Sequence, residues 1–124
     1  MANTEIMALF DKWNSALKTG DPHQVASLYE TNAILLPTIS NKVRHNHEEL
    51  EDYFVDFLAR CQEGKIDESN IRTFGDVAIN SGVYTLTFSD GIFVQARFTY
   101  VYRWNGQGWK IIEHHSSAMP EQSL

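Results

Sequence analysis

The sequence predicts an α+β domain in which three N-terminal helices pack in the concavity of a strongly curved, mostly antiparallel sheet. Three observations support this prediction. Apolar residues recur at helical spacing up to residue 61, and they alternate with a period of two from residue 66 onward. The alternating segments are also long enough to bend around the helices as a cone. The 124 residues fit a single domain, residues 1–124.

Two helices are expected before residue 30. Thr4 can cap the first, and Gly20 is expected to end it. The apolar positions of this helix form one stripe: Ile6, Leu9, Phe10, Trp13 and Leu17. Asp21 and Pro22 restart a short helix, because proline at the first helical position loses no hydrogen bond. This helix is expected to bury Val25, Leu28 and Tyr29.

A short strand and a third helix follow. Residues Ala33 to Leu36 resemble a strand that Pro37 stops, and residues 38–44 resemble a loop with room for a second short strand. Asn46 and Glu49 have the spacing of a capping box, which predicts a helix start. One face of that helix is apolar: Leu50, Tyr53, Phe54, Phe57, Leu58 and Cys61.

The rest of the chain predicts a meander of four strands. The strands are expected at Ile66–Phe74, Val77–Phe88, Ile92–Trp104 and Trp109–Ser117. The segments 89–91 and 105–108 are rich in turn residues and predict hairpins. Gly82 interrupts a strand and is expected to mark a bulge that bends the sheet.

Both faces of the last strands are unusually apolar. Phe98, Tyr100, Tyr102 and Trp104 share one face, and Arg97, Thr99, Val101 and Arg103 share the other. A sheet with one solvated face would show a plainly polar side. We therefore expect one face to cover the helices and the other to pack against a second copy of the chain, by two-fold symmetry.

Net charge, cysteine content and the absence of targeting patterns indicate the partners and the compartment to expect. The net charge is −6 and basic residues form no run, which disfavours nucleic acid and anionic membranes. Cys61 is the single cysteine, as suits a reducing compartment. The first residues do not resemble a signal peptide, and no apolar run approaches 18 residues. The sequence therefore predicts a cytoplasmic protein.

At this point the chain resembles a known superfamily. The segment 97–104, the turn and the segment 109–120 resemble the C-terminal hairpin of nuclear transport factor 2-like proteins. Within these, the chain is most similar to the association (hub) domain of calcium/calmodulin-dependent protein kinase II and its free-standing bacterial relatives. The Gly20-Asp21 boundary and the pattern at 53–58 fit as well, so the resemblance covers essentially the whole chain.

The resemblance implies a cystatin-like cone with a pocket between helices and sheet, and homodimers through the sheet. In the hub domain such dimers stack into rings, and arginines in the pocket favour small carboxylates. Those arginines align near Thr85, Thr99 and Ser116, so they are absent here. Arg97, on the same face as Thr99, is the candidate cation for a small organic anion. The alternative for Arg97 is a structural ion pair or a charge in solvent.

The candidate ligand-binding residues are Arg97, Thr99, His114, Ser116, Tyr53 and Trp13. Strand alternation places His114 and Ser116 toward the cone and Glu113 and His115 away from it, unless a bulge reverses the order. His114 is also the candidate catalytic residue, because a histidine can carry a proton near neutral pH. The alternatives are a core histidine satisfied by the backbone or Glu113, and aromatic residues that only pack.

No metal and no cofactor are expected. Glu113 and His115 could share a metal only with a third ligand, which no spacing supplies. The strands at 83–88 and 92–104 contain no Asp or Glu, so a carboxylate base would have to come from elsewhere.

Three functions remain open on the sequence. The first is a homo-oligomeric binding or assembly module whose cone takes a small organic anion. The second is a cofactor-independent isomerase or cyclase of the ketosteroid isomerase or SnoaL-like class, with His114 or a carboxylate as general base. The third is a structural dimer whose cone is filled by side chains.

Overall fold

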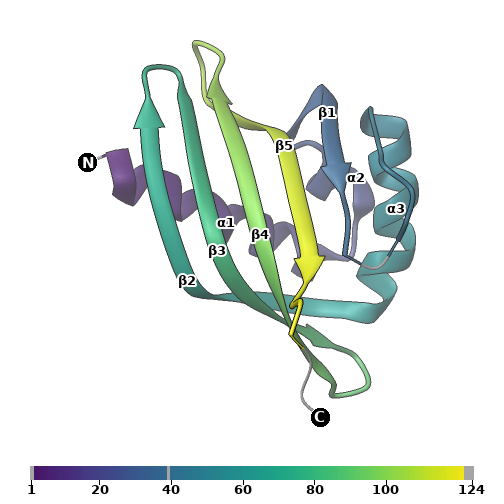
Figure 1. The fold of residues 1–124 in the computed structure, drawn as a ribbon. Coiled ribbons are helices and arrows are strands. Elements are labelled where there is room, and N and C mark those ends of the chain that lie inside the picture. The colour runs from purple at the N-terminus through teal and green to yellow at the C-terminus, as the bar shows by residue number, and fades with distance from the viewer. Residues whose placement is uncertain (1, 39, 122–124) are drawn as a thin grey trace.

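The computed structural model describes residues 2–38 and 40–121. The element order confirms the predicted α+β class: α1 (Ala2–Thr19), α2 (Pro22–Ala26), β1 (Tyr29–Leu36), α3 (His47–Arg60), β2 (Cys61–Phe74), β3 (Val77–Phe88), β4 (Phe93–Trp104) and β5 (Trp109–Ala118). The strands form one sheet in the order β1-β5-β4-β3-β2 (Figure 1). Strand β1 runs parallel to β5, and the other neighbours are antiparallel.

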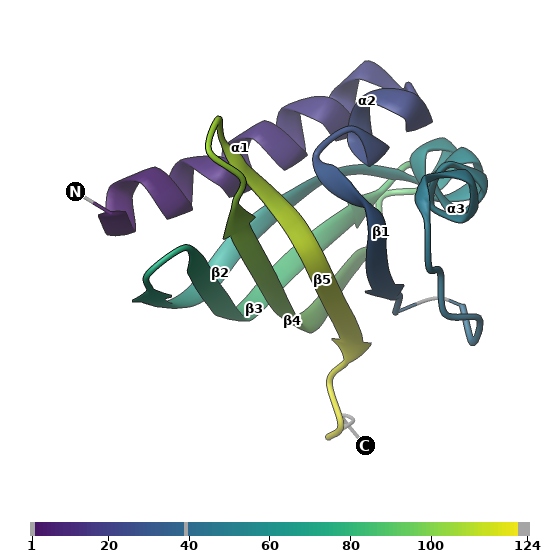
Figure 2. The ribbon, with the colours of Figure 1, turned by 90° about the horizontal axis from the view of Figure 1, so that it is seen from above.

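The helices lie on one side of the curved sheet. Figure 2 shows α1 running across the concave face and α3 standing beside β1. Inward positions of β3, β4 and β5 alternate with outward ones, so the large aromatic residues of β4 point toward the helices. None of the described helices covers the outward face of β2–β5.

Several element boundaries differ from the expected ones. Helix α1 already begins at Ala2, so Thr4 lies inside the helix and does not cap it. Tyr29 is buried as expected, but it starts β1 and does not belong to the second helix. Strand β2 starts at Cys61, where α3 ends, and not at Ile66. The alternation was hidden there because the inward position at Gly64 has no side chain.

The start of α3 follows the predicted capping box closely. The Asn46 side chain accepts a hydrogen bond from the Glu49 backbone N–H at 2.9 Å. The Glu49 carboxylate accepts in return from the backbone N–H of His45, one residue before the cap, at 3.0 Å. These reciprocal bonds fix where the helix begins and thereby aim its apolar face at the sheet.

The bulge predicted from Gly82 exists, but it lies in the neighbouring strand. The pairing of β2 with β3 shifts by one residue between Ile66 and Glu68. This brings the Glu68 backbone close to Gly82: a Cβ at position 82 would lie 2.0 Å from the Glu68 carbonyl oxygen. Glycine is required there because the bulged strand occupies the space of a side chain.

Candidate functional site

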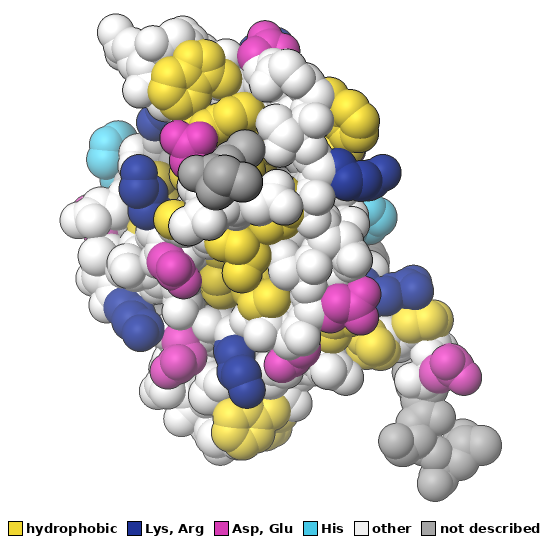
Figure 3. All heavy atoms as spheres, turned by 90° about the vertical axis from the view of Figure 1, so that its left-hand side faces the viewer, with side chains coloured by type: hydrophobic (Ala, Val, Ile, Leu, Met, Phe, Trp, Pro, Cys, Tyr) yellow, Lys and Arg dark blue, Asp and Glu magenta, His cyan; other side chains and the backbone are white. Residues whose placement is uncertain are grey.

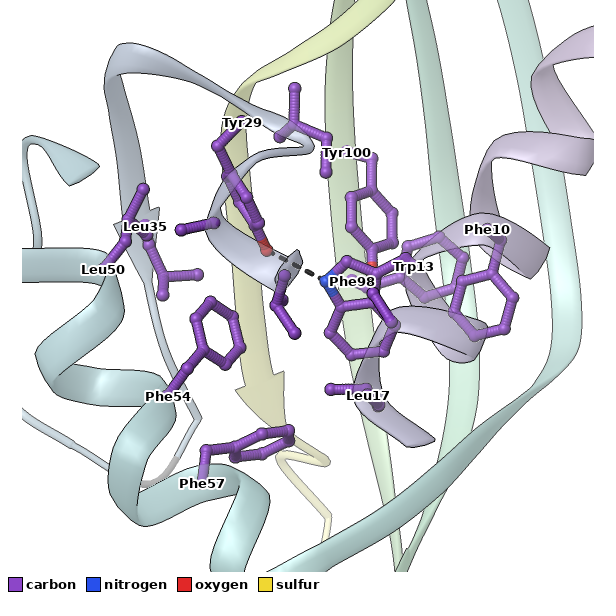
Figure 4. Packing of buried hydrophobic residues seen from close by; sticks show 14 of the residues in the cluster. Phe10, Trp13, Leu17, Tyr29, Leu35, Leu50, Phe54, Phe57, Phe98 and Tyr100 are labelled. Carbon is purple, nitrogen blue, oxygen red and sulfur yellow. Dashed lines mark hydrogen bonds between the residues drawn. The ribbon is translucent and has the colours of Figure 1, made fainter. Parts of the chain in front are cut away.

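The interior of the cone holds a small cavity that side chains nearly fill. Four of the predicted site residues, Trp13, Tyr53, His114 and Ser116, line it. Aromatic and aliphatic side chains from α1, α3 and β3 fill most of the remaining space, as Figure 4 shows for the core around Trp13 and Phe54. The cavity volume is about 10 Å³, which is room for about one water molecule.

A chain of hydrogen bonds crosses this interior. Trp13 Nε1 donates to Tyr29 Oη at 3.1 Å (Figure 4), and Tyr29 Oη lies 2.8 Å from His114 Nδ1. On the other side of the ring, His114 Nε2 lies 3.3 Å from Tyr84 Oη. Tyr84 Oη and Thr38 Oγ1 then each lie 2.5 Å from Ser116 Oγ. The chain joins α1, β1, β3, β5 and the segment after β1.

The direction of these bonds follows from the chemistry of tryptophan. An indole N–H can only donate, so Tyr29 Oη accepts from Trp13. The buried Tyr29 hydrogen then finds its partner at His114 Nδ1, which leaves the His114 proton on Nε2 to donate to Tyr84. Each of the five bonds from Trp13 to Thr38 then joins one donor to one acceptor. It requires His114 to be neutral, with one donor and one acceptor nitrogen.

His114 is held neutral by its surroundings. Its side chain is 3% exposed and stacks on the Tyr100 ring at 4.1 Å between centroids. Burial, with a smaller contribution from His115, lowers the pKa of His114 to about 3. Burial also raises the pKa of Tyr29 and Tyr84. The predicted inward position of His114 is confirmed, but its partners are tyrosine hydroxyls and not the backbone or Glu113.

The low pKa of His114 predicts a loss of stability in mild acid. The unfolded chain binds a proton at this position below about pH 6.5, whereas the folded chain does so only near pH 3. Between these values the free energy of unfolding should fall by up to about 1.4 kcal/mol per pH unit as pH decreases.

Urea denaturation at several pH values between 6 and 4 measures this slope. The Glu49 carboxylate, whose pKa is lowered by the His45 side chain, also loses its stabilising contribution as pH falls. That contribution is common to wild type and His114→Gln, so the difference between the two slopes reports His114. Equal slopes would contradict the assignment.

Arg97 and Thr99 do not face the cone, so their predicted placement is wrong. Both lie on the outward face of β4, where Arg97 is exposed and Thr99 is half-buried. The inward positions belong to Phe98 and Tyr100, which are 3% and 0% exposed. Large aromatic side chains gain more from burial than a guanidinium, so they decide which face of the strand turns inward.

A different arginine lies next to the cavity, and the sequence pattern did not single it out. Arg44 is 9% exposed, and its guanidinium lies 4.9 Å from the centroid of the Tyr53 ring. It donates to Ser40 Oγ at 2.6 Å and to the Lys42 carbonyl at 2.5 Å. These contacts fasten the segment after β1 to α3 and so help to close the cone.

The cavity lining offers little acid or base chemistry. Among the described residues that line it there is no Asp, Glu, Lys or Arg, and both ring nitrogens of His114 are engaged in hydrogen bonds. Within the described ranges, no three His, Cys, Asp or Glu side chains come close enough to hold a metal ion.

None of the helices seen in residues 2–38 and 40–121 is long and apolar enough to cross a membrane.

The partners of His114 could not be found from the sequence pattern alone. Tyr29 lies 85 residues before His114, and Tyr84 lies 30 residues before it. Only the strand register brings them together. The available signal was the alternation of side chains along the strand, which puts Tyr84 on the same inward face as Leu86 and Phe88.

Comparison with protein families gives one match over nearly the full chain. The model of the calcium/calmodulin dependent protein kinase II association domain family matches residues 2–120. No curated protein matches the chain.

Solved structures resemble the chain over almost all its length. A structure from Xanthomonas campestris, described as a calcium/calmodulin dependent protein kinase II association domain, is 48% identical with a TM-score of 0.91; the match covers 95% of this chain and 88% of that one. A nuclear transport factor 2-like protein with a cystatin-like fold from Novosphingobium aromaticivorans is 12% identical and has a TM-score of 0.79. The match covers 98% of this chain and 84% of that one.

A third structure, from Parabacteroides distasonis, is described as a ketosteroid isomerase. It is 21% identical, the match covers 93% of this chain and 86% of that one, and the TM-score is 0.76. At this identity the likeness concerns the fold alone.

Proposed function

We propose, from the premise that this chain belongs to the calcium/calmodulin dependent protein kinase II association domain family, that it is a self-assembly module. Two copies pair through the outward face of the sheet, and the filled cone serves as the rigid support of that face. The observation that carries this proposal is the composition of the outward face.

The centre of the outward face is uncharged. Six successive outward positions of β3 carry no charge, and all six are half-buried in the single chain: Val77, Ile79, Ser81, Val83, Thr85 and Thr87. Beside them on β4 lie Thr99 and Val101, which pair with Ser81 and Ile79. An uncharged, partly apolar centre of this kind is typical of surfaces that bury against another protein.

Charged side chains of both signs surround this centre. Glu68 and Arg72 of β2 flank it on one side, and Glu113 of β5 on the other. A surface with both signs can be complementary to itself when two copies meet about a two-fold axis. Arg97, beside Val83, belongs to the same face, which gives this exposed arginine a place outside the cone.

The β2 edge is less suited to pairing than the face. Strand β2 is an edge strand of the sheet, and it carries charged residues at positions 63, 65, 67, 68 and 72. Figure 3, which faces this side of the molecule, shows Lys, Arg, Asp and Glu side chains around a central hydrophobic area. Charges along an edge strand oppose edge-to-edge pairing of sheets, so the face is the better interface.

The size of the face is adequate for a stable dimer. Strands β2 to β5 have 14, 12, 12 and 10 residues. At the usual rise and spacing they make a face of about 40 by 19 Å, or about 760 Å². Stable interfaces bury about 800 Å² per partner, so nearly the whole face has to take part.

A charge at the centre of this face should separate the copies. We expect Thr99→Glu to weaken self-association at least about tenfold, because two like charges are desolvated in one interface. Light scattering coupled to size exclusion measures the mass. Thr73→Glu is the matched control and should keep the wild-type mass, because exposed Thr73 pairs with the inward position Ala78 and so does not belong to the outward face. Far-UV circular dichroism checks folding; a folded Thr99→Glu with unchanged mass would contradict the proposed interface.

The sequence also predicts that the cone binds a small organic anion. Binding of such an anion would require the cavity to widen. The segment that Arg44 fastens to Tyr53 would have to move, because the cavity has room for about one water. The isomerase alternative lacks a carboxylate base among the described lining residues. Assembly is therefore the function that the geometry supports best.

A further inference from the structure

A cleft separate from the cone cavity lies at the end of the sheet where β1, β5 and α3 begin and β4 ends (Figure 1). It shares no lining residue with the cone cavity, and its volume is about 470 Å³. Glu30, His47, Arg103 and Lys110 line it, and we call it the corner cleft. Its basic side chains can be reached from water, because Arg103 is exposed and His47 and Lys110 are only partly buried. A ligand in the cleft can therefore contact them directly.

Arg103 is held in one orientation and still has free donors. Its Nε donates to Glu30 Oε2 at 3.0 Å, and its Nη2 donates to Glu30 Oε1 at 2.5 Å. A guanidinium has five N–H donors, and within the described residues Nη1 makes no hydrogen bond. The side chain of Glu30 is 16% exposed and that of Arg103 is 50% exposed, so the guanidinium is the more accessible partner. The pair therefore presents a fixed guanidinium to an anion in the cleft.

Lys110 and His47 add donors from two neighbouring elements. Lys110 Nζ donates to the Ser27 carbonyl at 2.7 Å, which uses one of its three hydrogens. His47 Nε2 lies 2.6 Å from the Tyr29 carbonyl oxygen. A carbonyl oxygen can only accept, so Nε2 carries a hydrogen, and Nδ1 is the nitrogen that can bind a second proton beside an anion. The cleft thus brings together donors from β4, β5 and α3.

The charge of the corner cleft favours an anion with more than one negative charge. Among the described lining residues Glu30 is the only carboxylate, and Arg103 already balances it. Lys110 makes no ion pair within the described residues, so it remains an unbalanced cation in a chain of net charge −6. A phosphate monoester carries a charge of about −1.5 to −2 at pH 7 and three acceptor oxygens. A carboxylate has a single charge and two oxygens, so it would leave part of this arrangement unused.

The rest of the lining offers hydrogen bonds to an uncharged polar group. Thr31 and Asn105 are exposed and line the same cleft. Asn105 Oδ1 accepts from the backbone N–H groups of Gln107 and Gly108, each at 2.9 Å, so the turn fixes the amide and leaves its Nδ2 to donate. A side chain fixed in this way needs little reordering when a ligand binds, which favours affinity.

We propose that the corner cleft binds a phosphate monoester of a small hydroxyl-bearing molecule. The phosphate oxygens accept hydrogen bonds from Arg103, Lys110 and protonated His47. The hydroxyl groups of the ligand contact Thr31 and Asn105. The volume of about 470 Å³ lies within the usual range for small-molecule sites. The site goes beyond self-assembly and does not rest on it, because both basic side chains turn toward β1 and the residues just before it, and not toward the centre of the outward face.

Titration with glycerol 1-phosphate, followed in ¹H–¹⁵N NMR spectra at constant ionic strength, tests this proposal. We expect the backbone N–H signals of Thr31, His47 and Lys110 to move saturably at concentrations up to about 10 mM. Glycerate, which carries a carboxylate instead of the phosphate, should bind at least about tenfold more weakly. Glycerol has neither anion and should cause no saturable movement. Signals that move only at Trp13 and His114 would place the phosphate in the cone and overturn the proposal.

Two variants with matched controls identify the cations. Arg103→Gln and Lys110→Gln should each weaken binding of glycerol 1-phosphate at least about tenfold, since each removes a hydrogen bond between charged groups. Arg60→Gln and Lys18→Gln remove exposed basic side chains that do not line the cleft, and they should leave the affinity unchanged. Arg103→Gln also leaves Glu30 without its partner, so Lys110→Gln keeps the test decisive if that variant fails to fold.

A phosphorylated side chain of another protein is a second source of a phosphate monoester, and a short phosphoserine peptide distinguishes it. The peptide should bind no more tightly than glycerol 1-phosphate, since its chain loses conformational freedom on binding. Tighter binding of the peptide would overturn the assignment to a small molecule. The whole proposal is overturned by no saturable movement with glycerol 1-phosphate, by an equal response to glycerate, or by unchanged affinity in both Arg103→Gln and Lys110→Gln.

Discussion

Gly82→Ala should destabilise the fold by about 3 kcal/mol, the cost of a severe packing clash. The added methyl group would lie 2.0 Å from the Glu68 carbonyl oxygen and 2.7 Å from its carbon. Backbone atoms cannot rotate away, so β2 has to shift and lose hydrogen bonds to β3. Urea denaturation at fixed protein concentration measures the change, because self-association also affects apparent stability.

Gly64→Ala is the matched control for this experiment. A Cβ at position 64 meets the ends of the Leu86 and Phe10 side chains, each at 3.3 Å, and the Trp13 ring at 3.7 Å, an ordinary contact. These can move by a few tenths of an ångström, and the stiffer unfolded chain offsets part of the cost by about 0.4–1 kcal/mol. We expect a net change within about 1 kcal/mol. Equal effects at the two glycines would contradict the bulge at Glu68.

His114→Leu should cost about 3 kcal/mol, because it removes the centre of the hydrogen-bond chain. The Tyr29 hydrogen then has no acceptor, and Tyr84 loses the donor at His114 Nε2. The same change at exposed His23, which contacts Glu51 at the surface at 3.1 Å, should cost less than about 0.5 kcal/mol.

A double-mutant cycle separates the hydrogen bond from the packing of the ring. Tyr29→Phe alone leaves Trp13 Nε1 and His114 Nδ1 without partners. In the His114→Leu background the Nδ1 partner is already gone, so the second change should cost at least about 1 kcal/mol less. Additive effects would mean that Tyr29 and His114 do not interact.

The fold was predictable because its signals are local. The helix stripe from Ile6 to Leu17 and the alternation around Tyr100 each report which side of an element is buried, and the structure agrees. The predicted element boundaries were wrong where the sequence carries no distinguishing local pattern. Gly64, with no side chain, hid the start of β2, and Tyr29 fits the apolar face of a helix and of a strand equally well.

The candidate site was only partly predictable, since it depends on which residues meet across the sheet. The alternation of side chains along the strand placed His114 and Ser116 inward correctly. The register shift between the β4 pairs of Val101 and Tyr102 did not reverse this orientation. The placement of Arg97 failed because it was carried over from the resemblance against the alternation of the strand. The Phe98 and Tyr100 side chains indicated the opposite face.

The pairing of two copies through the sheet is the central claim, and the molar mass of the wild-type chain tests it most directly. Light scattering across a wide range of protein concentration should give a mass of at least twice the monomer at the higher concentrations. Because the outward face is uncharged at its centre and adequate in area, we expect this mass to persist on dilution to micromolar concentration. A monomer mass at every concentration would contradict the account.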